Sequence, residues 1–151
     1  MSVKIVHIEW DGPFSIEKVK EKKGENDCGV YQIYGNHPVY CYGALLYIGK
    51  AAGQTFSERI KQEEKWLQKE FGPFEIYTGD VDEEETDIQW EALVDLVEKL
   101  LIYSHQPAWN SSNLDSIPDK AIENTHILNW DLRRSLLPEV SGSRWTSKYD
   151  D

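Results

Sequence analysis

Apolar and polar residues alternate through the first part of the chain in a pattern that predicts short strands. Residues 3–15 predict a strand followed by a turn at Asp11, Gly12 and Pro13, and the charged segment after it predicts a short helix. We expect these first elements to form an N-terminal extension, residues 1–27, that packs on the main domain.

Two strand-like runs at 29–34 and 45–50 each carry a tyrosine and are separated by a loop rich in turn residues, which predicts a β-hairpin. A register symmetric about position 39 places Tyr31 opposite Tyr47. Because directly opposed residues of antiparallel strands lie on one face, the two phenols are expected side by side.

Two longer amphipathic segments predict helices. In the first, Thr55 is the N-cap and Glu58 completes a capping box, so that a helix is expected to about Glu70. The acidic run 80–87 is expected as a solvated loop and helix start, leading into a second helix over 87–104. Further strands are predicted at 73–79 and 125–130.

The order of these elements predicts an α+β fold with a small central antiparallel or mixed sheet flanked by helices. A chain of 151 residues suits one domain. We expect its core within residues 28–112, followed by a C-terminal extension, 113–151, whose fold the pattern does not define.

Composition narrows the classes of partner. A formal net charge of −11 argues against a protein that coats nucleic acid, so any nucleic-acid site must be local or assisted by cations. Cys28 and Cys41 match neither a zinc site nor a disulfide framework. The chain has no apolar run of about eighteen residues and its start lacks a secretory pattern, so we expect no membrane partner and a cytoplasmic location.

Glu98 stands out in the second predicted helix, because its neighbours at helical spacing are Val94, Leu101 and Ile102. A carboxylate in such dry surroundings must be paired, protonated or bound to a cation. The alternatives are a carboxylate that reaches solvent at the helix edge, or one paired with Lys99 or a distant arginine.

Other polar residues have two interpretations each. The guanidinium of Arg59 suits a phosphate, but it also lies one turn from Glu63, where a salt bridge forms readily. Tyr31 and Tyr47 suit catalysis or ordinary cross-strand packing. The turn at 107–110 brings Asn110 back beside the end of the second helix, to fix a backbone turn or an active-site wall.

Taken in order, these pieces resemble a known family. GVY at 29–31, YIG with Lys50 at 47–50, Arg59 on the next helix, Glu98, and PAWN at 107–110 are similar to the motifs of the GIY-YIG nuclease superfamily. The resemblance covers roughly residues 28–112.

The resemblance implies a mechanism. It assigns catalytic roles to Tyr31, Tyr47, Lys50, Arg59, Glu98 and Asn110, and substrate contacts to Gly49, Lys50 and Arg59. Glu98 is expected to hold one divalent cation, Mg²⁺ with Mn²⁺ as a substitute. Tyr47 is expected as general base, with Lys50 lowering its pKa, and Arg59 as the clamp on the phosphoryl oxygens. Tyr31 positions water or phosphate, and Asn110 supports the pocket.

One position departs from the family pattern. The family carries His or Tyr four residues after the arginine, whereas this chain has Glu63. Glu63 is expected to neutralise Arg59, to act as an alternative base or to add a metal contact. His37, in the hairpin loop, is interpreted as a surface residue, with replacement of the missing histidine as the alternative.

The resulting hypothesis is a Mg²⁺-dependent nuclease that cuts DNA, with RNA as an alternative substrate and a protein partner supplying basic surface. A second hypothesis is a non-catalytic subunit that binds nucleic acid or protein in a repair, mobile-element or defence system. A third is a hydrolase of small nucleotides, which suits the acidity because no long polyanion is bound.

Overall fold

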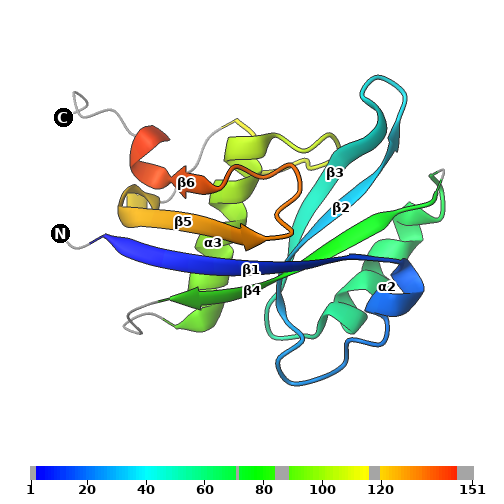
Figure 1. Ribbon diagram of the computed structural model, residues 1–151, viewed down its shortest axis with the longest axis horizontal. Coiled ribbons are helices and arrows are strands. Elements are labelled where there is room, and N and C mark those ends of the chain that lie inside the picture. The colour runs from blue at the N-terminus through cyan, green and yellow to red at the C-terminus, as the bar shows by residue number, and fades with distance from the viewer. Residues whose placement is uncertain (1–2, 71, 84–88, 116–119, 146–151) are drawn as a thin grey trace.

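The computed structural model describes residues 3–70, 72–83, 89–115 and 120–145. Its centre is a six-stranded mixed sheet with the strand order β3-β2-β4-β1-β5-β6, which confirms the predicted α+β class (Figure 1). The strands are β1 (Lys4–Phe14), β2 (Gly29–His37), β3 (Cys41–Ala51), β4 (Glu75–Glu83), β5 (Thr125–Asp131) and β6 (Glu139–Ser141). The β1–β5 pair is parallel and the other pairs are antiparallel.

The segments before and after the predicted core contribute strands to the same sheet. Strand β1 lies between β4 and β5, and β6 forms the edge opposite β3. Figure 1 shows β2 and β3 extending away from the other strands as a long hairpin. Residues 1–27 and 113–151 therefore supply β1, β5 and β6 beside the strands of the central segment.

Two hydrophobic clusters pack on opposite faces of the sheet. In β2, Val30 and Tyr34 pack with α3 (Trp90–His105), whereas Tyr31 and Ile33 pack with α2 (Phe56–Leu67). Because successive side chains of a strand point to opposite faces, the two helices cover different sides. The remaining helical elements are α1 (Ile16–Val19), η1 (Lys120–Asn124) and η2 (Gly142–Trp145).

The capping signal of α2 is confirmed, because the Thr55 side chain accepts a hydrogen bond from the Glu58 N–H. The helix ends at Leu67 rather than near Glu70, since the last turn tightens at Gln68, whose N–H meets the carbonyls of Glu64 and Trp66. Such tightening is common at helix ends.

Two expectations for loops are wrong. The turn predicted at Asp11, Gly12 and Pro13 is a register shift inside β1, which continues to Phe14. The first four residues of the acidic run, 80–83, belong to β4 and pair with β1, so partner strands override the local polarity. Residues 84–87 lie outside the described residues.

Helix α3 begins at Trp90 and ends at His105, close to the expected 87–104, although 87 and 88 lie outside the described residues. Gln106 adopts a left-handed conformation just before Pro107, which terminates the helix. Among the described residues, no helix has both the length and the apolar character needed to cross a membrane.

Candidate functional site

The predicted hairpin forms, but its register differs from the symmetric one. His37 pairs with Cys41, as a centre at position 39 requires, yet β3 carries one extra residue at each of two irregularities. Tyr31 therefore lies opposite Gly49, and Tyr47 lies opposite Ile33. A shift of two residues keeps side chains on the same face. The two phenol rings remain neighbours, with centroids 6.1 Å apart.

Gly49 makes room for one of these rings. A Cβ at this position would overlap the Tyr31 hydroxyl and lie 2.8 Å from Cε1 of Tyr47. The glycine is itself buried. The space above its backbone is thus filled by a side chain, and the expected contact between Gly49 and a substrate finds no support.

We predict that Gly49→Ala lowers the free energy of unfolding by about 1–3 kcal/mol, because the new methyl group overpacks the buried Tyr31 ring. Urea denaturation measures the change. The control is a double-mutant cycle: in a Tyr31→Ala background the ring is gone, and the same substitution should cost much less. An equal cost in both backgrounds would show that the ring is not what requires glycine here.

Tyr31, Arg59 and Glu63 form one hydrogen-bonded group on the α2 side of the sheet. The Tyr31 hydroxyl donates to Glu63 over 3.1 Å and accepts from Arg59 Nε over 3.2 Å. Arg59 Nη2 lies 3.0 Å from Glu63 Oε1. Of the three roles left open for Glu63, the structure shows the ion pair with Arg59.

Glu63 is 5% exposed and accepts a further hydrogen bond from the indole Nε1 of Trp66. Its carboxylate is therefore surrounded by donors from Tyr31, Arg59 and Trp66. Hydrogen bonds to a carboxylate favour its charged form and offset the cost of burial. This arrangement fixes the position of the guanidinium.

The sequence predicted that Lys50 lowers the pKa of Tyr47. In the structure, the protein's own groups together raise this pKa instead. Burial raises the pKa of Tyr47 above its usual value, the charge of Glu63 raises it further, and Arg59 only partly opposes them. Burial also raises the pKa of Tyr31 well above its ordinary value. Lys50 is bound to Asp95 instead of acting on a phenol.

Glu98 is half-buried on α3, and within the described part of the chain its carboxyl has no hydrogen bond or ion pair. Burial raises its pKa to about 7, with Lys50 opposing the shift and Asp95 adding to it. The dry surroundings expected from its apolar neighbours are thus present. The alternative, an ion pair with Lys99, is not found among the described residues, where Lys99 binds Asp95 at 2.8 Å.

Glu98 lies on α3, the helix that covers one face of the sheet, whereas Tyr31 and Tyr47 lie on the other face. However, β3 is an edge strand, and the charge of Glu98 acts on Tyr47 and is itself influenced by Arg59. The structure therefore brings Tyr47, Arg59 and Glu98 into electrostatic range of one another, with Lys50 on the α3 side.

Asn110 holds the edge strand that carries these residues. Its side-chain oxygen accepts from the Ile48 N–H over 3.0 Å and its amide donates to the Ile48 carbonyl over 2.9 Å. The N–H groups of Ala108 and Trp109 bind the carbonyls of Leu45 and Leu46. The 107–110 turn is thus tied to β3 by backbone and side-chain hydrogen bonds, and Asn110 positions the segment between Tyr47 and Gly49 as a wall.

His37 has a structural role in the hairpin. Its Nδ1 accepts hydrogen bonds from the N–H groups of Val39, at 3.0 Å, and Tyr40, at 3.2 Å, which closes the turn. The imidazole is half-buried rather than fully exposed. Among the described residues, no hydrogen bond joins it to Arg59 or Glu63.

Asp95 and Trp66 are the residues that sequence reasoning missed. Asp95 lies three residues before Glu98 on the same helix and binds both Lys50 and Lys99. Burial by itself would raise the pKa of the Asp95 carboxyl, but the hydrogen bonds and charges of the two lysines lower it overall. Its spacing of three from Glu98 was a signal that it shares a helix face. Trp66 likewise lies three residues after Glu63 on α2, a spacing that places both side chains on one helix face.

The chemistry of Glu98 fits a hard divalent cation. Such cations prefer oxygen ligands and keep several waters. Among the described residues no group of three or more His, Cys, Asp or Glu is placed to hold a metal ion, and Glu98 is the proposed ligand. An unpaired, half-buried carboxyl of raised pKa is the donor that a bound cation would stabilise in its charged form.

The resemblance to the GIY-YIG nucleases rests on the quoted sequence motifs alone. No family model matches the chain, and no curated protein or solved structure matches it significantly.

Proposed function

We propose that this protein is a divalent-metal-dependent phosphodiesterase of the GIY-YIG type that hydrolyses DNA, with RNA as an alternative substrate. The observation that carries the proposal is Glu98, a half-buried carboxyl without a protein partner in the described residues. Lys50, Arg59 and Tyr47 lie within its electrostatic range. Unpaired acidic groups with strongly raised pKa values concentrate at functional sites.

In the proposed mechanism, each side chain has one task. Glu98 would hold Mg²⁺, which when bound supplies positive charge to the phosphoryl and leaving oxygens. Arg59 donates hydrogen bonds to the phosphoryl oxygens and is held in place by Glu63 and Tyr31. Asn110 keeps β3 in position through its two bonds to Ile48.

Tyr47 is the proposed general base. Its phenolate oxygen accepts a proton from water. The water oxygen then bonds to phosphorus, and the bond from phosphorus to the 3′ oxygen breaks. Because burial raises the Tyr47 pKa, the ionised form is scarce at neutral pH unless positive charge is added nearby. Arg59 supplies part of that charge.

One observation favours the second hypothesis, a non-catalytic nucleic-acid- or protein-binding subunit of a repair, mobile-element or defence system. The guanidinium of Arg59 is already engaged by Glu63, Tyr31 and Gln62. A phosphate would have to share or displace these partners. Under either hypothesis a protein with a basic surface is a suitable partner, because the chain has a net charge of −11.

The decisive experiment is a cleavage assay on single- and double-stranded DNA and RNA with Mg²⁺, with Mn²⁺ and with chelator. We expect cleavage only with added metal. Arg59→Ala should reduce the rate by about 10²–10³-fold, as the loss of a transition-state hydrogen-bond donor does. Lys61→Ala, an exposed cation on the same helix, is the matched control and should retain the rate. Failure of the native protein to cut any substrate with either metal would reject catalysis.

A further inference from the structure

A continuous strip of aromatic rings leads from the candidate site to the tip of the β2–β3 hairpin. Neighbouring ring centroids lie 4.7–6.2 Å apart along the whole series. In order, the strip consists of Tyr31, Tyr47, Trp66, Trp109, His37 and Tyr40. Three separate parts of the chain, the hairpin, α2 and the 107–110 turn, therefore contribute to one aromatic surface.

Most of this aromatic strip is accessible from solvent. Tyr47, Trp66, Trp109 and His37 are half-buried, and Tyr40 is 65% exposed. The rings in the middle are also held firmly. Trp66 donates to Glu63, and His37 caps the hairpin turn through its Nδ1. Rigid, half-exposed rings lose little conformational entropy when a flat ligand stacks on them.

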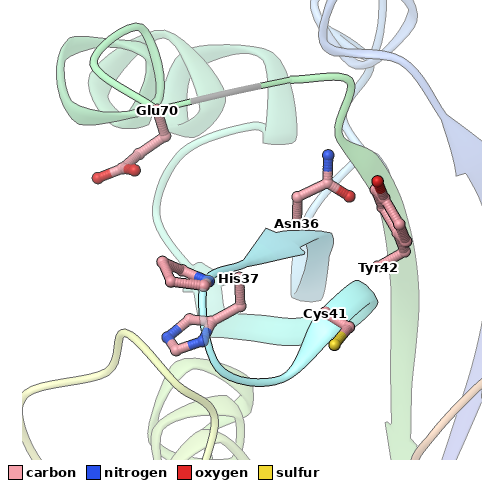
Figure 2. A pocket seen from close by; sticks show the side chains of 6 residues that line it. Asn36, His37, Cys41, Tyr42 and Glu70 are labelled. Atoms are coloured by element: carbon pink, nitrogen blue, oxygen red, sulfur yellow. The ribbon is translucent and has the colours of Figure 1, made fainter.

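The aromatic strip ends at a surface groove of about 450 Å³, which lies within the size range of small-ligand sites, about 300–1,000 Å³. The groove is lined by Asn36, His37, Pro38, Cys41, Tyr42 and Glu70. Figure 2 shows Tyr42 and His37 on different sides of this space, with Asn36 between them and Glu70 across from the hairpin. His37 belongs to both features and connects the groove to the strip.

Two polar side chains of the groove lack partners. Asn36 and Glu70 make no side-chain hydrogen bond or ion pair within the described residues. An amide and a carboxylate there offer hydrogen-bond donors and acceptors to the edge of a planar ligand. Tyr42, which is 88% exposed, offers a ring face that the protein does not cover.

We propose that the aromatic strip and the groove form a binding subsite for unpaired nucleobases of a single strand. The inference rests on the proposed function, because the strip begins at Tyr31 and Tyr47, where the scissile phosphate is expected. Bases beside that phosphate stack on Trp66 and Trp109, and one base enters the groove between His37 and Tyr42. The substrate class is therefore a nucleic acid with a single-stranded segment next to the cut.

The chemistry of the surface favours a nucleic acid over an apolar peptide. Stacking on aromatic side chains is worth about 1–3 kcal/mol per base and tolerates any base sequence. Lys65 and Lys69, both exposed, lie one residue before and three residues after Trp66 in the chain, and the proposal assigns them to the phosphates of the bound strand. Such local cations are needed in a protein whose net charge is −11.

Binding of a labelled single strand of roughly twelve nucleotides tests this subsite. The measurement is fluorescence anisotropy in chelator, where metal-dependent cleavage is absent. We expect the native protein to bind this strand more tightly than a duplex of the same length. Tyr42→Ala combined with Tyr40→Ala should weaken single-strand binding about tenfold or more, because one lost stack of about 1.4 kcal/mol is tenfold in affinity.

Trp130→Ala is the matched control. Trp130 is 49% exposed and stacks on His7, away from the aromatic strip, so its removal should leave affinity unchanged. Circular dichroism checks that the variants fold, which is expected because Tyr40 and Tyr42 are exposed. Equal losses in the Trp130 and tyrosine variants would overturn the proposal, as would binding of a proline-rich peptide in place of the strand.

The outcomes separate this inference from the proposed function. If the native protein cuts nucleic acid but the tyrosine variants bind single strands as it does, the subsite is wrong and the nuclease stands. If the native protein binds single strands through Tyr40 and Tyr42 but cuts none, the subsite is supported and catalysis is rejected. Absence of any single-strand binding overturns the subsite.

Discussion

Replacing Glu98 by glutamine should abolish metal-dependent cleavage and, at the same time, remove a destabilising effect on the fold that grows as pH rises above the usual pKa of a glutamate. Glutamine keeps the shape of the side chain but cannot carry the charge that a cation needs. We expect a loss of at least about 10³-fold in rate, the scale on which single catalytic groups act. Cleavage with Mg²⁺ and with Mn²⁺ measures the loss.

The stability effect follows from the pKa of Glu98, which burial raises from 4.5 to about 7. Between these values the folded state binds more protons than the unfolded state, so the free energy of unfolding falls as pH rises. The rise in the Glu98 pKa corresponds to a loss of roughly 3 kcal/mol in the free energy of unfolding at pH 8. Relative to Glu98→Gln, the native protein should therefore lose about that much stability between pH 4.5 and 8.

Urea denaturation of both proteins at several pH values measures this difference. Asp95→Asn is the matched control on the same helix, because Lys50 and Lys99 lower the Asp95 pKa despite its burial. Its charge contributes stability that is present at neutral pH and is lost in acid. The control should thus change the pH dependence in the opposite direction. Parallel pH profiles for the native protein and Glu98→Gln would contradict the assigned surroundings of Glu98.

The substitution Glu63→Ala is expected to destabilise the protein by about 3 kcal/mol, near the lower end for breaking a buried ion pair. It removes the acceptor for Tyr31, Arg59 and Trp66 together. Arg59 retains some solvent, with 28% of its side chain exposed, which limits the penalty. For a chain of this size the midpoint of thermal unfolding should fall by roughly 6–12 °C.

Glu64→Ala is the control for Glu63. Glu64 is the next residue of α2 and pairs with Lys20, and these side chains are 21% and 27% exposed. Its loss should destabilise the protein much less than the loss of Glu63, as for pairs near the surface. Glu63→Gln, which keeps an acceptor oxygen, separates the catalytic interpretations. If Glu63 only holds Arg59, this variant retains cleavage; if Glu63 is the base, cleavage is lost.

Local sequence signals predicted the elements that carry the candidate site. The capping box at Thr55 and Glu58 marked the start of α2, and the apolar neighbours of Glu98 indicated its dry surroundings. Both signals depend on residues within one or two helix turns of each other, so they hold in the folded protein whatever the distant segments do. The alternation around Tyr31 and Tyr47 likewise placed both phenols on one face.

Contacts between segments far apart in the chain determined the hairpin register and the pairing of the strands, which the local signals did not predict. Two irregularities in β3 shifted the hairpin by two residues, and pairing with β1 placed residues 80–83 in a strand. Strand β1 lies inside the sheet because it pairs in parallel with β5, whose residues are more than a hundred positions away in the chain. Such pairings depend on which strands meet, which local polarity does not encode.

The sequence by itself determined the residue types of the candidate site, their order and the helices and strands that carry them. Only the tertiary structure decided their chemical states. It enclosed Glu63 among three donors, paired Lys50 with Asp95, left Glu98 without a partner in the described residues and raised the pKa of Tyr47. The physical reason is that charge and burial depend on neighbours in space, and these come from segments far apart in the chain.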